Sequence, residues 1–392
     1  METVHDGRDL LVISDLHLGE ALAADDPQAH RLEEELCAFL EHHRGDGRAW
    51  QLVINGDMVD LVGMTLMPAD VDPIDGIHPD DHHYGLGARA HVATLKLQKL
   101  LAERPAVFAA LGRFLAAGHG LAIVVGNHDV ELHWPEVQQV LADAIVARAA
   151  EAGGDPAHLA QAITFHGWFY LEEGLAWIEH GHQYDPYCSF EDVLEPATDT
   201  LEADPNVGAL LLRYLGPLMG AQIHGMWGHT FFGFLRFWVA QGRSRVVAIL
   251  AAYLGVVRRM VEHWRARGPE RVAARRERAR ARLRAVARRL RLEEERLVAL
   301  AALAKPPVSV ELVRIVRALM VDRLALLVLL ALAAPLVAVL PWFWGWWSWG
   351  CSRCPWGCRR GMRWWRGSPS TRARRCGGSR GGSGRWRRCR SW

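Results

Sequence analysis

The chain has 392 residues and half of them are hydrophobic, so it can bury a sizeable core in one large domain with appendages or in two domains. Its net charge of +2 conceals an asymmetry: residues 1–200 carry 10 Lys and Arg against 34 Asp and Glu, and the remainder carries 36 against 10. The acidic half suits cation binding, whereas the basic half suits an anionic membrane surface or nucleic acid.

The N-terminal residues and the cysteines indicate the cellular compartment. METVHDGRDLL has no basic region and no apolar region of a signal peptide, so we expect none. Only Cys37 and Cys188 precede residue 350, which argues against a disulfide framework and for a reducing compartment.

Short apolar runs alternate with helical patterns along the first 205 residues. The runs predict strands at 8–14, 50–54, 121–125 and 175–179, and the patterns predict helices at 28–43, 88–116 and 136–151. Strands that alternate with helices indicate an α/β sheet covered on both sides, which we assign to a domain over 1–205. The acidic, His-rich stretch 70–83 is expected to be a solvated loop near a site.

Residues 206–323 change in character. Positions 214–235 have no formal charge when histidine is neutral, and we interpret them as an apolar insertion that faces a membrane. The Arg-rich stretch 271–304 predicts long helices, and its basic face could bind nucleic acid. We prefer a solvated helical hairpin and do not expect a nucleic-acid partner, because no aromatic residues accompany the arginines.

Two further segments follow. Positions 324–340 are 17 uncharged residues, which could span the bilayer, lie within it or form a buried core helix with Pro335 inside. Positions 341–392 hold 10 of the 17 Trp and 5 of the 7 Cys but no Leu, Ile or Val. Such a stretch cannot build an ordinary core, and we interpret it as a frameshifted, disordered tail.

Four clusters of polar residues follow the predicted strands. They are ISDLHLGE (13–20), INGDMVD (54–60), VVGNHD (124–129) and WIEHGHQYDP (177–186). A single cluster would be an ordinary polar turn. Four of them at the carboxyl ends of strands, where open α/β sheets assemble their sites, predict one functional centre.

The residue types in these clusters suit metal ions. Asp15 and His17 can hold one divalent ion from a single loop, and Asp57 has two oxygens with which to bridge two ions. Asn127 and His180 can hold the second ion. Mixed nitrogen and oxygen donors favour manganese, iron, zinc or cobalt, and two such ions can activate a water for attack on a phosphoryl group.

The order DLH, GD, GNHD and HGH over residues 8–190 resembles the calcineurin-like metallophosphoesterases. The resemblance implies a four-layer αββα sandwich and a dinuclear site in which the five ligands keep these roles. The apolar and Arg-rich segments after residue 205 add a helical, partly membrane-associated C-terminal extension to this fold. The resemblance also implies that His128 stabilises or protonates the leaving oxygen and that Asp129 orients His128. Asp60 and Asp185 are expected to support the loops, and His182 either lines the site or shapes its turn.

One departure from the family pattern concerns the last motif, GHxH. This chain offers GHTF, and His229 is either a degenerate copy of the motif or unrelated to it. If the tail is frameshifted, the complete motif lies in the lost frame. A chain without that ligand could instead be a non-catalytic scaffold.

The motifs SDLHLG, GDMVDL and HGHQYDP resemble the branch that contains UDP-2,3-diacylglucosamine hydrolases. This resemblance implies hydrolysis of a UDP-linked lipid in lipid A biosynthesis at the cytoplasmic surface of the inner membrane, with the chain peripheral or crossing once. His128 stands where that branch usually has Arg, so a broad-specificity phosphodiesterase is the alternative. The sequence leaves the oligomeric state open.

Overall fold

The computed structural model of the chain describes residues 7–19, 27–196, 204–219 and 243–319, together with 321, 322, 329 and 333. The chain divides into two units, Met1–Ala325 and Leu326–Trp392, and all helices and strands below belong to the first. His229 lies outside the described residues. So do the predicted hydrophobic helix (324–340), except residues 329 and 333, and the predicted tail (341–392). The predicted domain boundaries stay a prediction.

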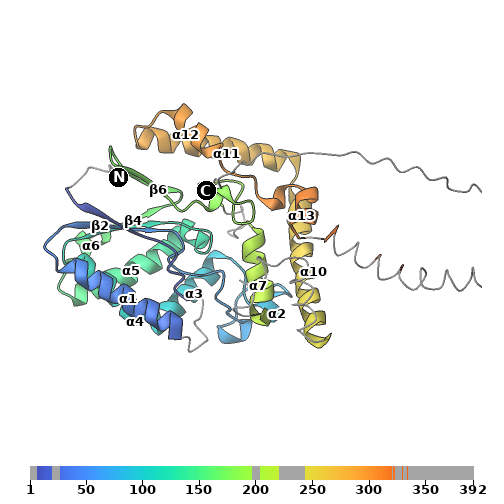
Figure 1. Cartoon of the computed structure of the whole chain (residues 1–392), viewed down its shortest axis with the longest axis horizontal. Helices are drawn as coiled ribbons and strands as arrows, with labels where there is room; N and C mark the ends of the chain where they lie inside the picture. Colours follow the sequence, from blue (N-terminus) through green and yellow to red (C-terminus); the bar gives the residue numbers. More distant parts are fainter. Residues whose placement is uncertain are drawn as a thin grey trace, which may run out of the picture. The chain divides into compact units, whose positions relative to one another are not determined.

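A parallel four-stranded sheet forms the centre of the first unit (Figure 1). Its strands lie side by side in chain order: β1 (Asp9–Ile13), β2 (Trp50–Asn55), β3 (Gly120–Val124) and β4 (Ile163–His166). Leu11 pairs with Leu52, and Val53 pairs with Ala122. Every residue of β3 is buried, as expected for a continuous apolar run in a sheet covered on both faces.

Four helices cover one face of this sheet (Figure 1). They are α1 (Pro27–Arg44), α3 (Ala90–Glu103), α4 (Pro105–Ala116) and α5 (Pro135–Glu151). Leu40, Leu97, Leu111 and Leu141, one from each helix, share a buried apolar cluster with the sheet. The stretch 88–116 is two helices, because Pro105 starts α4, where its fixed φ suits a first turn and its missing N–H costs nothing.

A two-stranded antiparallel hairpin packs on the other face of the sheet. It consists of β5 (Phe169–Glu172) and β6 (Ala176–Glu179). Tyr170 and Ile178 of the hairpin share an apolar cluster with Val53, Ala122 and Val124 of the sheet. The strand predicted at 175–179 therefore forms as β6, but it pairs in the hairpin and not in the parallel sheet.

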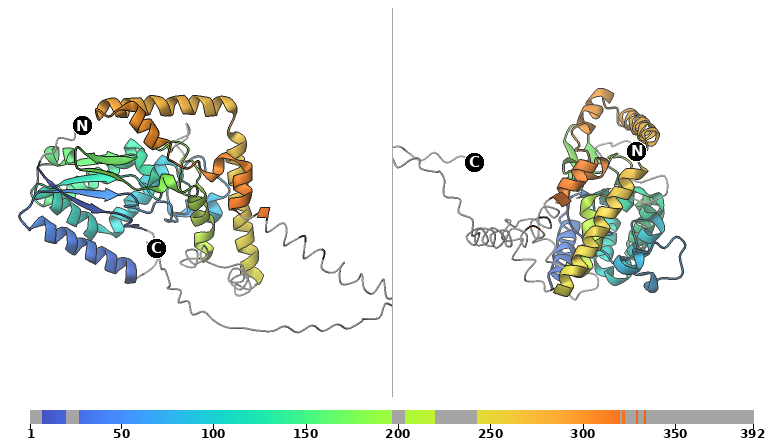
Figure 2. Two further views of the ribbon diagram at one scale, coloured as in Figure 1. Left: turned by 45° about the horizontal axis from the view of Figure 1, so that its top comes forward. Right: turned by 90° about the vertical axis from the view of Figure 1, so that its right-hand side faces the viewer.

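Helices α11 (Pro269–Arg289) and α12 (Glu294–Ala301) cover the outer side of the hairpin (Figure 2). Trp168 and Phe169 share a buried cluster with Ala287 of α11 and Leu297 of α12. The predicted helical hairpin is confirmed, although this face of it is packed and not solvated. The layers thus follow one another as helices, parallel sheet, β-hairpin and helices. The predicted α/β class is confirmed. The four-layer sandwich of the family stays a prediction.

A third helical group lies beside the carboxyl ends of the strands (Figure 1). It contains α7 (Val207–Met219), α10 (Arg243–Ala266) and α13 (Leu312–Ala318). Tyr214, Val256 and Ile315 are fully buried in its core, so the described part of the predicted apolar insertion packs against protein. Nowhere in the described part of the chain does a helix combine the length and apolar character that a bilayer span requires.

The loop predicted as solvated at 70–83 is held at its end by charged contacts with these helices. Tyr214 donates a hydrogen bond to Asp80 over 2.5 Å, and Arg213 donates to Asp81 over 2.5 Å. Asp80 and Asp81 are both buried, which corrects the prediction for this end of the loop. The remaining short elements are η1 (Pro68–Asp70), α2 (Asp81–Tyr84), η2 (Val130–His133), α6 (Pro156–Gln161), η3 (His182–Tyr184) and η5 (Val308–Val310).

Candidate metal centre

The polar clusters predicted from the sequence meet at the carboxyl ends of β1, β2 and β3, which are neighbours in the sheet. The loop after β1 and the loop after β2 continue the parallel pairing of their strands. Asp15 N–H donates to the Gly56 carbonyl over 3.1 Å, and His17 N–H donates to the Asp57 carbonyl over 2.9 Å. These backbone bonds fix the spacing between the Asp15–His17 pair and Asp57.

Two groups of side chains are close enough to hold a metal ion. His17, Asp57 and His128 form one group, and Asp15, Asp57 and His180 form the other. Within each group the ligand atoms lie within 4.8 Å of one another, and Asp57 belongs to both. The predicted bridging residue thus lies where it can contact two ions.

The backbone at this centre is strained. Asp15, His17 and Asp57 have φ values of 55°, 45° and 52°, in the left-handed region that side chains other than glycine disfavour. Among the other described residues, only Arg291 and several glycines have positive φ. Such strain costs about 1–3 kcal/mol per residue and tends to concentrate at functional sites, so the three residues are held in place by their surroundings.

Two glycines allow the loops to approach this closely. A Cβ on Gly56, whose φ is +79°, would lie 2.3 Å from the His180 ring. A Cβ on Gly126 would lie 2.1 Å from Asp57 Oδ1. The glycines of the GD and GN motifs are therefore required by the packing of Asp57 and His180.

Asp57, the carboxylate that belongs to both groups, is buried, with 3 % of its surface exposed. Its Oδ2 lies 3.3 Å from His180 Nε2 and 3.7 Å from His17 Nε2, and its Oδ1 accepts the His128 N–H over 2.9 Å. Burial alone would raise the pKa of Asp57, but the hydrogen bond from His180 and the charges of His128 and His180 lower it to about 2. Asp57 is therefore ionised at neutral pH.

His180 reaches the centre from the end of β6. Its Nδ1 lies 2.9 Å from the Asn55 carbonyl, and the Asn55 side chain donates back to the Glu179 carbonyl over 3.1 Å. The carbonyl can only accept, so Nδ1 carries a proton and Nε2 faces Asp57. Burial lowers the pKa of His180, but Asp57 outweighs burial and raises it to about 9.

His128 is oriented by Asp60 and not, as expected, by Asp129. His128 Nδ1 lies 2.9 Å from Asp60 Oδ1, which leaves Nε2 as the ring nitrogen available to a ligand. Burial lowers the pKa of His128, but the hydrogen bond and charge of Asp60, together with Asp57, raise it to about 9. In the sequence, the contact between Asp60 and His128 is indicated only by the position of Asp60 in the same polar cluster as Asp57, three residues after it.

Asp129 holds the backbone of two loops together. It is fully buried, and its carboxylate accepts N–H groups of Gly126 and Met58, each over 2.7 Å. These bonds use the oxygens that would otherwise orient His128. Burial and the nearby charge of Asp57 raise the pKa of Asp129 to about 7.

The remaining predicted residues occupy the same loops. Asn127 is half-buried between Gly126 and His128, and its role as a ligand stays a prediction. His182 Nδ1 is buried with no hydrogen-bond partner. Asp185 accepts the Tyr187 N–H over 2.9 Å and supports the turn after His182.

The donor set fits a metal ion. His17 Nδ1 is a buried polar atom without a hydrogen-bond partner, and its Nε2 faces Asp57. Carboxylate and imidazole groups gathered around one shared carboxylate are the donors that first-row divalent ions prefer. His and Asp groups are thus positioned to hold a metal ion at this edge of the sheet.

Comparisons of the chain with models of protein families, with curated proteins and with solved structures found no significant match.

Proposed function

We propose that the chain is a metal-dependent phosphoester hydrolase with two divalent ions at the strand ends. The observation that carries this proposal is the position of Asp57, a buried carboxylate shared by two groups of ligands on strained backbone. One carboxylate shared between two ion positions can hold two ions close together, which is what two-metal phosphoester hydrolysis needs. Positive φ at three of the five proposed ligands, Asp15, His17 and Asp57, supports a functional site over an ordinary polar turn.

Asp57 would be shared by the two ions, His17 would lie at one of them, and Asp15 and His180 would lie at the other, so the predicted Asp15–His17 pair is divided between the two positions. Asn127 stays a predicted further ligand. When bound, the ions would neutralise phosphoryl oxygens and activate a water for in-line attack, and manganese is the metal that we favour. His128 would bind or protonate the leaving oxygen through Nε2, because Asp60 holds its Nδ1. Asp129 fixes the loop backbones on which His128 and Asp57 are carried.

The substrate class is a proposal that rests on the motif resemblance. A pyrophosphate bond in a UDP-linked lipid at the cytoplasmic membrane surface is our first choice, and a generic phosphodiester is the alternative. Hydrolysis rates on two substrates distinguish the two classes: an acylated UDP-sugar presented in detergent, and bis(p-nitrophenyl) phosphate. Preference for the lipid would support the narrower class.

Substitution of the shared carboxylate tests the reaction class. Asp57→Asn keeps the shape of the side chain but removes the charge that both ions need. We expect Mn²⁺ binding in calorimetry to fail at both positions, and hydrolysis of bis(p-nitrophenyl) phosphate to fall by about a hundredfold or more. The matched control is Asp143→Asn on the exposed surface of α5, which should retain both properties.

Two results would contradict the proposal. Full turnover in Asp57→Asn would exclude a bridging role for this residue. One tightly bound ion per wild-type chain without turnover of any phosphoester would indicate the non-catalytic scaffold instead.

A further inference from the structure

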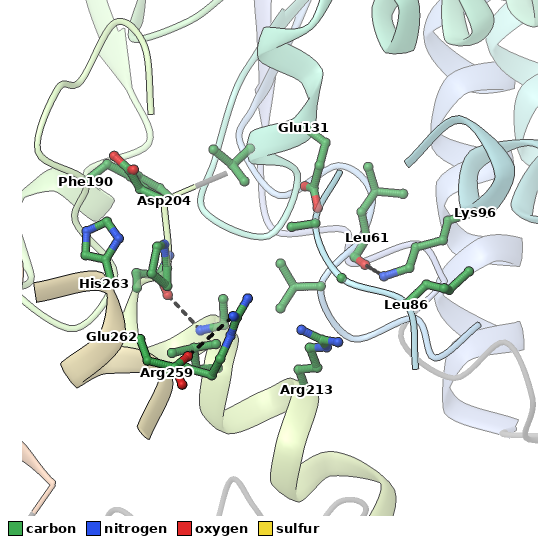
Figure 3. Close-up of a pocket in the computed structure, with 18 of the residues that line it drawn as sticks. Leu61, Leu86, Lys96, Glu131, Phe190, Asp204, Arg213, Arg259, Glu262 and His263 are labelled. Atoms are coloured by element: carbon green, nitrogen blue, oxygen red, sulfur yellow. Dashed lines mark hydrogen bonds and ion pairs between the residues drawn. The ribbon is translucent and has the colours of Figure 1, made fainter. Parts of the chain in front are cut away.

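A cavity of about 290 Å³ lies between the loops after β2 and β3 and the helices α7 and α10 (Figure 3). Its volume is near the lower end of the range for pockets that hold small molecules. Part of its wall is apolar and is formed by Leu61, Val62, Leu86, Val130, Phe190 and Leu210. The cavity is thus suited to a small ligand with some apolar surface.

The cavity is separate from the candidate metal centre but adjoins its loops. None of the predicted metal ligands lines it. Leu61 directly follows Asp60, and Glu131 lies two residues after Asp129. A ligand in this cavity would therefore contact protein beyond the metal-binding residues.

Glu131 and Asp204 are the two lining residues of the cavity that each have a buried carboxylate oxygen without a hydrogen-bond partner, and Glu131 is the more deeply buried of the two. Only 1 % of its surface is exposed, and its Oε2 has no hydrogen-bond partner. Figure 3 shows its carboxyl group directed into the space between Phe190 and Leu61. A buried carboxylate oxygen without a donor is costly, so the site lacks a hydrogen-bond donor at this point.

Lys96 supplies a donor on the neighbouring wall. It extends from α3, and its Nζ donates to the Leu61 carbonyl over 2.7 Å (Figure 3). An ammonium group has three protons, so this bond leaves donors for a further acceptor. The cavity thus presents an acceptor on Glu131 and a donor group on Lys96.

The formal charges around the cavity balance. Its cationic side chains are Lys96, Arg213 and Arg259, and its acidic side chains are Glu131, Asp204 and Glu262. Asp204 also accepts a hydrogen bond from Arg275 of α11. A wall whose formal charges balance gives no overall preference for an anion or a cation, and an ion of either sign would lose hydration on entry.

We propose that this cavity binds a neutral polyhydroxylated ligand about the size of a monosaccharide. A hydroxyl group both donates and accepts, so one ligand can donate to Glu131 and accept from Lys96. The carbon face of such a ring can pack on the apolar wall near Phe190. The proposal does not depend on the hydrolytic function, because its residues are not those of the metal centre.

Binding of three neutral probes to the full chain tests this inference. Glucose, myo-inositol and glycerol are titrated in the presence of EDTA, so that the result is independent of any bound metal, and binding is followed by saturation-transfer NMR. We expect saturable binding of at least one of them. Glucosamine and glucuronate match glucose in size but carry a charge, and we expect them to bind at least about tenfold more weakly.

Variants then locate the bound probe. Glu131→Met removes the acceptor while keeping the length of the side chain, and we expect binding to weaken by about tenfold or more, because hydrogen bonds to charged groups are the strong ones. Glu151→Met, on the exposed end of α5, is the matched control. Ala209→Leu leaves Glu131 in place but fills the cavity from α7, and should also prevent binding.

The inference is overturned if none of the three neutral probes binds, or if binding survives both cavity variants. It is also overturned if the charged sugars bind as well as glucose. A crystal structure that shows only ordered water beside Glu131 at a saturating concentration of the probe that binds would have the same consequence. Loss of hydrolysis in Asp57→Asn has no bearing on any of these results.

Discussion

The contact between Asp60 and His128 makes a prediction about stability in the absence of metal. Asp60→Asn keeps the size of the side chain and removes its charge. The pKa of His128 is raised from 6.5 to about 9 in the folded chain, against the effect of burial, chiefly by Asp60. Without that charge, burial should dominate and bring the pKa of His128 down.

The magnitude follows from the pKa difference. A rise in the pKa of His128 from 6.5 to about 9 means that protonation of the ring stabilises the folded chain by about 3 kcal/mol. This value is the upper limit for the contribution of Asp60. Because the folded-state pKa is raised, this stabilisation is fully present below pH 6.5 and is lost as the pH rises through about 9. The difference between wild type and Asp60→Asn should shrink over that interval.

Urea unfolding with EDTA at about pH 6 and about pH 10 measures the difference directly. We expect the destabilisation by Asp60→Asn to be up to about 3 kcal/mol larger at the lower pH. The control is the same substitution in a His128→Gln background, where the pH-dependent part should vanish. An equal effect of Asp60→Asn at both pH values would refute the assignment of Asp60 as the partner of His128.

Two glycine substitutions test the close approaches. Gly126→Ala would place a Cβ 2.1 Å from Asp57 Oδ1, so we expect weaker Mn²⁺ binding in calorimetry, and unchanged affinity would contradict the packing described here. Gly255→Ala, inside α10, would place a Cβ 2.6 Å from the buried ring of Tyr214. We expect it to destabilise the chain by about 1–3 kcal/mol in urea unfolding despite the better helix propensity of alanine. Gly208→Ala is the control for both, since its Cβ would meet only contacts of 3.5 Å or more.

The parallel strands were predictable because their signal is local. Apolar runs predicted β1, β2 and β3 to within one or two residues. For β2 and β3 the reason is burial, since a strand covered on both faces needs continuous hydrophobicity, whereas β1 is an apolar run at the edge of the sheet with no fully buried residue. Strands β4 and β5 were missed, because ITFH and FYLE are short and are interrupted by polar residues. Because β6 pairs with β5, the antiparallel pairing of β6 could not be predicted once β5 had been missed.

The candidate site was predictable in its members but not in its contacts. The carboxyl ends of neighbouring parallel strands lie at one edge of a sheet, and this rule brought Asp15, His17, Asp57 and His128 together. It does not specify which carboxylate meets which ring. Asp60 and Asp129 differ in role because of the paths of two loops, which no spacing in the sequence records.

The α/β class and the strand ends at which the polar residues gather follow from the amino-acid sequence, because hydrophobic periodicity and parallel topology act over short stretches of chain. Tertiary structure alone decided three further properties: the strained backbone of Asp57, the burial of Asp80 and Asp81, and the cavity beside Glu131. Each of these depends on segments far apart in the chain. Tyr214 is 134 residues from Asp80, and Met58 is 71 residues from Asp129. Contacts at such separation arise only when the sheet and the α7–α10 helices have packed.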